Sequence, residues 1–333
     1  MNILLSFAGY KTYLIQFFKQ AVGNKGKVYV CDCEFSYSFT NADSYFITPP
    51  AYDDSYISVL IDFCKKNDIK VIIPLSDNDL QVLAKNKSKF QELDISVVVS
   101  DEKIIDICFD KWKTHHFLES VGIKHPKSYI DLKYVKQDIN AGKISFPIAI
   151  KPRFSSEKTN SIEVLTIEEL DMFYYKMQQN ILSTSDIQGK DNILMYETLS
   201  GDHYGLCLLN DLQGNFVTAA ALKKLIWSDI CTMSGCTIDI LPFDSIIKTI
   251  SSELKHIACL EIDCCITNSG ETLLSKLYPR FGHSYPLWHF AGANFPKQIM
   301  DWLNGLPTSK DNISFEIGIT SAEGSYFKTI EKF

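Results

Sequence analysis

The chain has 333 residues, 46% of them hydrophobic and 22% charged, which suffices for a sizeable core and predicts two or three domains or lobes. Its formal net charge of -7 argues against a nucleic-acid partner. The longest apolar runs, such as 71–75, are too short to span a bilayer, which argues against a membrane protein. The N-terminus lacks a basic signal region, and the 10 cysteines form no zinc pattern, so we expect reduced thiols and a cytoplasmic location.

Residues 1–109 alternate between strand and helix patterns. Strands are predicted at 3–7, 27–31, 70–74 and 95–99, with helices at 13–21, 56–67 and 80–90. This alternation predicts a Rossmann-like parallel sheet with helices on both faces, whose ligands bind beyond the carboxyl ends of the strands. Gly9 and the turn 76–79 lie at such ends. Because no G-x-G-x-x-G is present, ordinary turn chemistry with a helix cap at Asp77 or Asp79 explains these residues as well as nucleotide binding does.

Further along, the strand 146–152 (FPIAIKP) delivers Lys151 into an otherwise apolar sheet, where a lysine requires a partner. A buried strand, ILMYE, is predicted at 193–197, and a hairpin follows with strands at 204–209 and 216–222. A long helix is predicted at 243–257, and a last strand at 315–320.

The segment 256–305 organises the chain. It reads as paired strands at 258–266 and 272–277, a Pro-Arg-Phe-Gly turn at 279–282, and a helix at 296–303. Two paired strands that end in a turn with acidic and basic side chains can hold a metal ion and a polyphosphate.

The motifs resemble the C-terminal signature of the ATP-grasp superfamily, most closely the group of carboxylate-amine ligases similar to the large chain of carbamoyl-phosphate synthase. The residues in register are Asp263, Pro279, Arg280, Phe281, Gly282, Tyr285, Pro286, Ala291, Gly292, Asn294 and Pro296. The runs DKWK (110–113) and FPIAIKP resemble family motifs too, so the likeness covers essentially the whole chain. It implies an α/β fold with a Rossmann-like domain at 1–109, an ATP-grasp small lobe with its linker helix at 110–194, and a large lobe at 195–333.

The resemblance also implies a nucleotide site for ATP. Lys111, Lys151 and Lys224 would contact its phosphates, and the loop after Lys151, with Ser155 and Ser156, would cradle them. The strand 193–197, with Leu194, Met195 and Glu197, would hold the adenine. His203 would accept a hydrogen bond from the ribose. A surface lysine is the alternative for Lys111, a structural carboxylate partner for Lys151, and a turn-stabilising role for Arg280, which would otherwise steady an acyl phosphate in an active enzyme.

Five departures from the family pattern gather in this cleft. The phosphate loop 153–161 has no glycine, and His203 replaces a glutamate. Ser228 and Cys231 stand where arginine and glutamate are expected, and Lys276 and Tyr278 stand where the family has its metal-binding glutamate and asparagine.

Magnesium prefers oxygen ligands, and of the family's three only Asp263 remains. A lysine at about 4 Å, with an effective dielectric near 20, repels each positive charge of a metal by about 4 kcal/mol. Three explanations for Lys276 therefore stay open: a slipped register, a built-in cation against phosphate and Asp263, or a nucleotide that is no longer used.

The leading hypothesis is a degenerate ATP-grasp protein that binds ATP weakly or without magnesium and acts as a binding or partner subunit. The competing hypothesis is an active ATP-dependent ligase that joins an amine or amino acid to a carboxylate through an acyl phosphate. A small-molecule carboxylate, a homo-oligomer and a paralogous ATP-grasp chain are the partners that these hypotheses imply.

Overall fold

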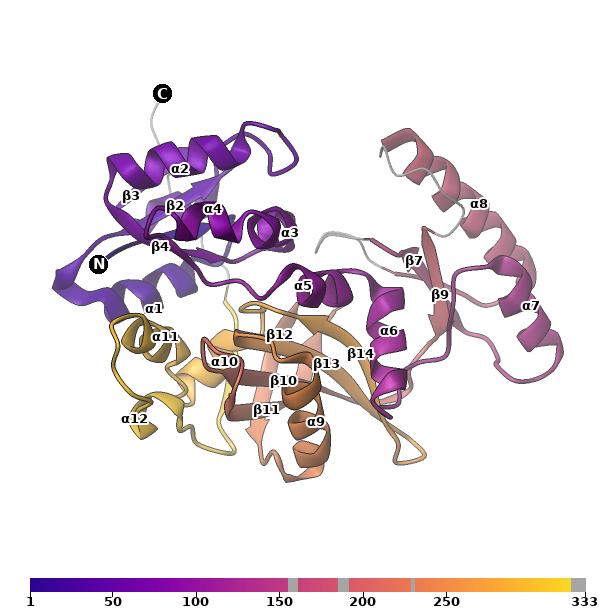
Figure 1. The fold of residues 1–333 in the computed structure, drawn as a ribbon. Coiled ribbons are helices and arrows are strands. Elements are labelled where there is room, and N and C mark those ends of the chain that lie inside the picture. The colour runs from indigo at the N-terminus through magenta and orange to yellow at the C-terminus, as the bar shows by residue number, and fades with distance from the viewer. Residues whose placement is uncertain (155–160, 185–191, 229–230, 325–333) are drawn as a thin grey trace.

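The computed structural model describes residues 1–154, 161–184, 192–228 and 231–324, and their strands form three sheets (Figure 1). The first sheet is parallel, has the order β3-β2-β1-β4-β5, and confirms the predicted Rossmann-like fold. Its strands are β1 (Asn2–Ser6), β2 (Val28–Asp32), β3 (Ser44–Ile47), β4 (Ile69–Pro74) and β5 (Ser96–Val97). Its helices are α1 (Thr12–Val22), α2 (Tyr56–Lys66), α3 (Asp77–Lys85) and α4 (Lys87–Gln91), with 3-10 turns η1 (Gly23–Lys25) and η2 (Tyr37–Thr40).

Successive residues of β1 face opposite sides of this sheet, so each side has its own core. Ile3 packs with α1, while Leu4 packs with α2 and α3. The predicted helix at 80–90 is instead two helices that begin at Asp77. Their cap is Ser76, whose side chain accepts from the N–H of Asn78, so the cap predicted at Asp77 or Asp79 is wrong.

Two linker helices, α5 (Glu102–Phe109) and α6 (Lys111–Ser120), follow the first sheet. Asp110 separates them and caps α6 by accepting from the backbone N–H groups of Trp112 and Lys113. Leu118 and Ile123 join the core that lies against the third sheet. The linker helices thus pack on the large sheet, and in Figure 1 α6 lies between this sheet and the small lobe.

The second sheet has the order β6-β9-β7-β8. Its elements are β6 (Ser128–Tyr129), α7 (Leu132–Asn140), β7 (Ile148–Pro152), β8 (Ile162–Val164), α8 (Ile167–Thr184) and β9 (Ile193–Glu197). Because all of β9 pairs with β7, we propose that the small lobe extends through Glu197 and does not end at 194.

The third sheet is antiparallel and has the order β14-β13-β10-β11-β12-β15. Its strands are β10 (Gly201–Asn210), β11 (Phe216–Trp227), β12 (Thr232–Ile238), β13 (Ala258–Thr267), β14 (Thr272–Tyr278) and β15 (Thr320–Ala322). The 3-10 turn η3 (Leu241–Phe243) and the helices α9 (Asp244–Leu254), α10 (Tyr285–Phe290), α11 (Phe295–Leu303) and α12 (Lys310–Ile313) accompany them.

Two predicted elements of this region differ from the structure. The helix expected to reach residue 257 ends at Leu254, because Lys255 takes a left-handed backbone with φ 53°. The strand expected at 315–320 is wrong, since the last strand begins only at Thr320 and pairs with β12. Within the described residues, no helix combines the length and the apolar character needed to cross a membrane.

Candidate functional site

A cavity of about 190 Å³ lies between the small lobe and the large sheet. The small lobe and the segment after it supply Lys151, Tyr196, Thr198 and Leu199, and the large sheet supplies His203, Lys224, Trp227, Ser228, Asp263, Ser275 and Lys276. The structure therefore brings Lys151, His203, Lys224 and Asp263 together around one space, as the sequence analysis expects. Tyr196 and Trp227 are wall residues that the sequence analysis did not single out.

Lys151 enters the cavity from β7 and is only 5% exposed. Its Nζ lies 4.4 Å from the ring centroid of Tyr196 on the neighbouring strand β9. The antiparallel register pairs Lys151 with Leu194, which places Tyr196 diagonally across on the same face. Lys151 therefore has an aromatic ring as a partner, and its ammonium group still borders the cavity.

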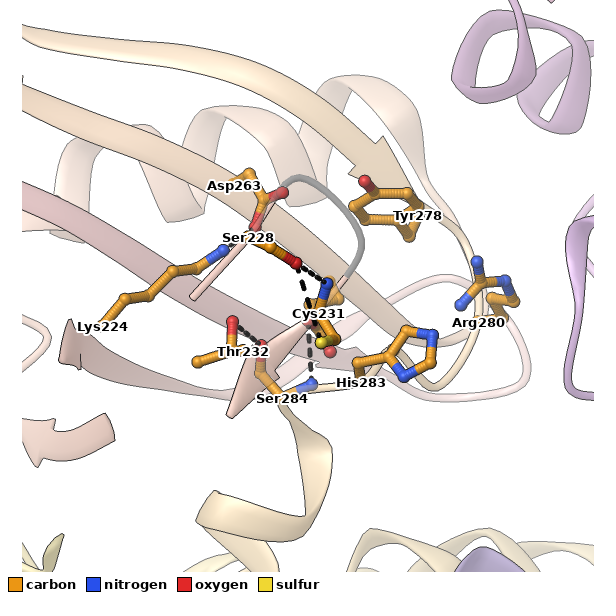
Figure 2. Close-up of a pocket in the computed structure, with 11 residues that line it drawn as sticks. Lys224, Ser228, Cys231, Thr232, Asp263, Tyr278, Arg280, His283 and Ser284 are labelled. Carbon is orange, nitrogen blue, oxygen red and sulfur yellow. Dashed lines mark hydrogen bonds and ion pairs between the residues drawn. The ribbon is translucent and has the colours of Figure 1, made fainter. Parts of the chain in front are cut away.

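The opposite wall carries an ion pair between Lys224 of β11 and Asp263 of β13 (Figure 2). Lys224 Nζ lies 2.5 Å from Asp263 Oδ1, and the side chains are 7% and 19% exposed. Burial alone favours the neutral acid, but the charges of Lys224 and Lys276 outweigh it and lower the pKa of Asp263. Burial also opposes the charge of Lys224, yet the carboxylate beside it raises the pKa of this lysine. Both partners are thus charged at neutral pH.

This arrangement does not fit a magnesium ion. The hairpin register places Lys276 directly opposite Asp263 and places Tyr278 opposite Glu261. Asp263 therefore has one ammonium group bonded to it and a second cationic residue across from it, where a metal would need further oxygen ligands. Among the residues that the structure describes, no three His, Cys, Asp or Glu side chains are grouped so as to hold a metal.

A second, smaller cavity of about 40 Å³ shares Lys224, Ser228 and Asp263 with the first. Its other lining residues are Cys231, Thr232, Glu261, Tyr278, Arg280, Gly282, His283 and Ser284 (Figure 2). The sequence analysis missed Glu261, although a signal was present. It stands two residues before Asp263 on a predicted strand, and such residues face the same side of a sheet.

Arg280 borders the smaller cavity but is tied to the N-terminal domain. Its Nε and one terminal nitrogen donate to the two carboxylate oxygens of Asp77 at 2.7 and 2.9 Å. Its side chain is only 2% exposed. This bidentate pair agrees with the structural alternative for Arg280, and its role at an acyl phosphate stays a prediction.

Those of the other predicted nucleotide residues that the structure describes do not line either cavity. Lys111 donates to the backbone oxygen of Arg153 at 3.2 Å, and burial together with Lys276 lowers its pKa to about 8. Glu197 accepts a hydrogen bond from the backbone N–H of Lys127. Leu194 and Met195, which were expected to sandwich the adenine, are buried in the small lobe, and Met195 belongs to its core. Ser155 and Ser156 lie outside the described residues.

Comparisons with known proteins agree with this architecture. Residues 3–98 match the family model described as the PylC-like N-terminal domain. No curated protein sequence matches the chain.

Three of the similar solved structures illustrate the likeness. The biotin carboxylase domain dimer of Hydrogenobacter thermophilus 2-oxoglutarate carboxylase, in complex with MgADP, ADP and bicarbonate, has 14% identity and a TM-score of 0.73, with coverage of 94% of this chain and 72% of that chain. N5-carboxyaminoimidazole ribonucleotide synthetase from Thermotoga maritima has 16% identity and a TM-score of 0.67, with coverage of 96% and 79%. L-amino acid ligase from Bacillus licheniformis has 15% identity and a TM-score of 0.69, with coverage of 96% and 78%. The chain therefore has the ATP-grasp fold that its sequence motifs predict.

Proposed function

We propose that this protein binds ATP in the cavity between its lobes without magnesium, and that it acts as a binding or partner subunit. The observation that carries the proposal is the Lys224–Asp263 ion pair with Lys276 opposite. The acid that would ligate a metal is neutralised by an ammonium group, so a metal would have to displace it and approach a second lysine as well.

The charges around the larger cavity favour a polyphosphate. Lys151, Lys224 and Lys276 approach it from both lobes, and Asp263 and Glu163 are the acids among its lining residues. Lysine ammonium groups bind phosphate as point charges, so they offset part of the negative charge that a bound magnesium otherwise offsets. Trp227 lies 4.0 Å from His203 between ring centroids and offers an aromatic face to a base.

The proposed role as a subunit follows from the same site. A cleft that holds ATP without metal lacks the ion that bridges the phosphates during phosphoryl transfer. Binding would then change the conformation or the assembly of the protein, either as a homo-oligomer or beside a paralogous ATP-grasp chain. The dimeric carboxylase domain named above shows that a protein of this fold can assemble with nucleotide bound.

A paired substitution tests the proposal. Lys276→Glu with Tyr278→Asn restores two oxygen ligands beside Asp263, and ATP binding to this variant should become at least tenfold tighter when magnesium is added. The matched control is Lys133→Glu with Tyr134→Asn, which makes the same changes on the exposed part of α7. Calorimetric titration should show no effect of magnesium on this control. If magnesium does not change ATP binding to the double variant, Lys276 and Tyr278 are not what excludes the metal, and this result would contradict the proposal.

A further inference from the structure

A buried ion pair between Arg153 and Asp110 joins the end of strand β7 to the linker. The Nε and one terminal nitrogen of Arg153 donate to the two carboxylate oxygens of Asp110 at 2.8 and 2.7 Å. The two side chains are only 14% and 1% exposed. A bidentate pair of this kind is specific in its geometry, and burial protects it from screening by salt. It therefore fixes the small lobe to the linker at this point.

The neighbours of this ion pair reinforce it. Lys111 Nζ donates to the backbone oxygen of Arg153 at 3.2 Å. The rings of Phe109 and Phe154 are stacked, with their centroids 6.3 Å apart. Three consecutive linker residues, 109–111, thus contact the two residues that directly follow β7.

This contact lies far from the two chain connections of the small lobe. The connection 121–127 leads into β6, and the connection 198–200 follows Glu197 at the end of β9. Glu197 pairs with Ile148, the first residue of β7, so both connections lie near the start of that strand. Arg153 follows the last residue of β7, roughly 16 Å further along. If the linker contact broke, the two connections would form a hinge at the opposite end of the lobe.

The lobe that is held in this way covers the larger cavity. Lys151, on the cavity wall, stands two residues before Arg153 and is 5% exposed. The side chain of Lys224, on the opposite wall, is 7% exposed. We propose that the contact of 109–111 with Arg153 and Phe154 is a latch that holds the small lobe over the cavity, which opens when the ion pair breaks. The latch would control access to the site of the proposed function, on which its role rests, but its test needs no ATP, so the two proposals can fail separately.

Acetylation of the full chain by a small acylating reagent, followed by peptide mass spectrometry, measures the opening. Lys151 and Lys224 react slowly while they are buried and faster when the lobe swings away. Asp110→Asn breaks the ion pair but keeps the cap of α6, because asparagine caps a helix as well as aspartate does. Arg153→Met breaks the pair from the other side and leaves Asp110 with the backbone N–H groups that it caps. In both variants, Lys151 and Lys224 should be acetylated about tenfold faster than in the wild type.

The two substitutions separate opening from a change in charge. Loss of the carboxylate lowers the pKa of nearby lysines and speeds their acetylation, whereas loss of the guanidinium raises their pKa and slows it. Opposite effects of the two variants would therefore overturn the latch, and so would no effect of either.

Two controls complete the experiment. Asp106→Asn removes an exposed partner of Lys113 and should leave the acetylation of the cavity lysines unchanged. Lys11, which is 3% exposed in the N-terminal domain, should react no faster in the latch variants than in the wild type. Equal acceleration at Lys11 would show general unfolding in place of local opening, and it would overturn the latch as well.

Discussion

The Arg280–Asp77 ion pair joins the turn after β14 to the start of α3, and so couples the large lobe to the N-terminal domain. Asp77→Asn preserves the shape of the side chain but removes the negative charge that pairs with Arg280. The side chain of Arg280 is only 2% exposed. Breaking a buried pair on one side costs about 3–5 kcal/mol. Because Asp77 is itself 14% exposed, we expect the free energy of unfolding to fall by about 3 kcal/mol, the low end of that range.

Urea unfolding at pH 7 measures this loss, with Asp106→Asn as the matched control. Asp106 pairs with Lys113, and their side chains are 44% and 47% exposed, so this substitution should cost less than about 1 kcal/mol. In the variant Asp77→Asn with Arg280→Met, no buried charge is left alone, and we expect it to recover most of the loss. If Asp77→Asn costs no more than the control, the pair does not couple the two parts of the protein.

Three further predictions follow from the site. Burial and the neighbouring His125 lower the pKa of His115 to about 3 in the folded protein. As the pH falls below 6.5, His115 is therefore protonated in the unfolded chain but stays neutral in the folded protein, and the free energy of unfolding decreases. Wild type should therefore lose about 2 kcal/mol more than His115→Gln between pH 6.5 and 5, measured by urea unfolding; parallel curves would contradict this. Lys151→Met should weaken ATP binding at least tenfold in calorimetric titrations, while Lys133→Met should leave it unchanged. With ATP, magnesium and a panel of carboxylates, hydroxylamine should trap no acyl phosphate, and any ATP-dependent hydroxamate would restore the ligase hypothesis.

The fold could be predicted because its signals are local and ordered along the chain. The alternation of strands and helices before residue 100 and the paired strands around residue 268 depend on periodicity and turn residues, which sequence reveals directly. Element ends were less predictable. The start of α3 depends on Ser76 as a cap, and the end of α9 depends on the left-handed backbone of Lys255.

The site was predicted in part, because contacts between distant segments leave no local signal. The strand position of Lys151 indicated a buried cation, but its neighbour Tyr196 lies on another strand. Likewise, a cation at Asp263 was only one of three explanations left open for Lys276, and the pairing of Asp263 with Lys224, which comes from β11 on the far side of β10, was not predicted. The partner of Arg280 lies 203 residues away in the sequence.

Calorimetric titration of ATP into the purified wild-type protein, with magnesium and with a chelator, tests the central claim most directly. If lysines occupy the place of the metal, ATP should bind with the same affinity in both buffers. Binding that becomes at least tenfold tighter with magnesium would contradict the account, because it would require oxygen ligands that displace Lys224 from Asp263.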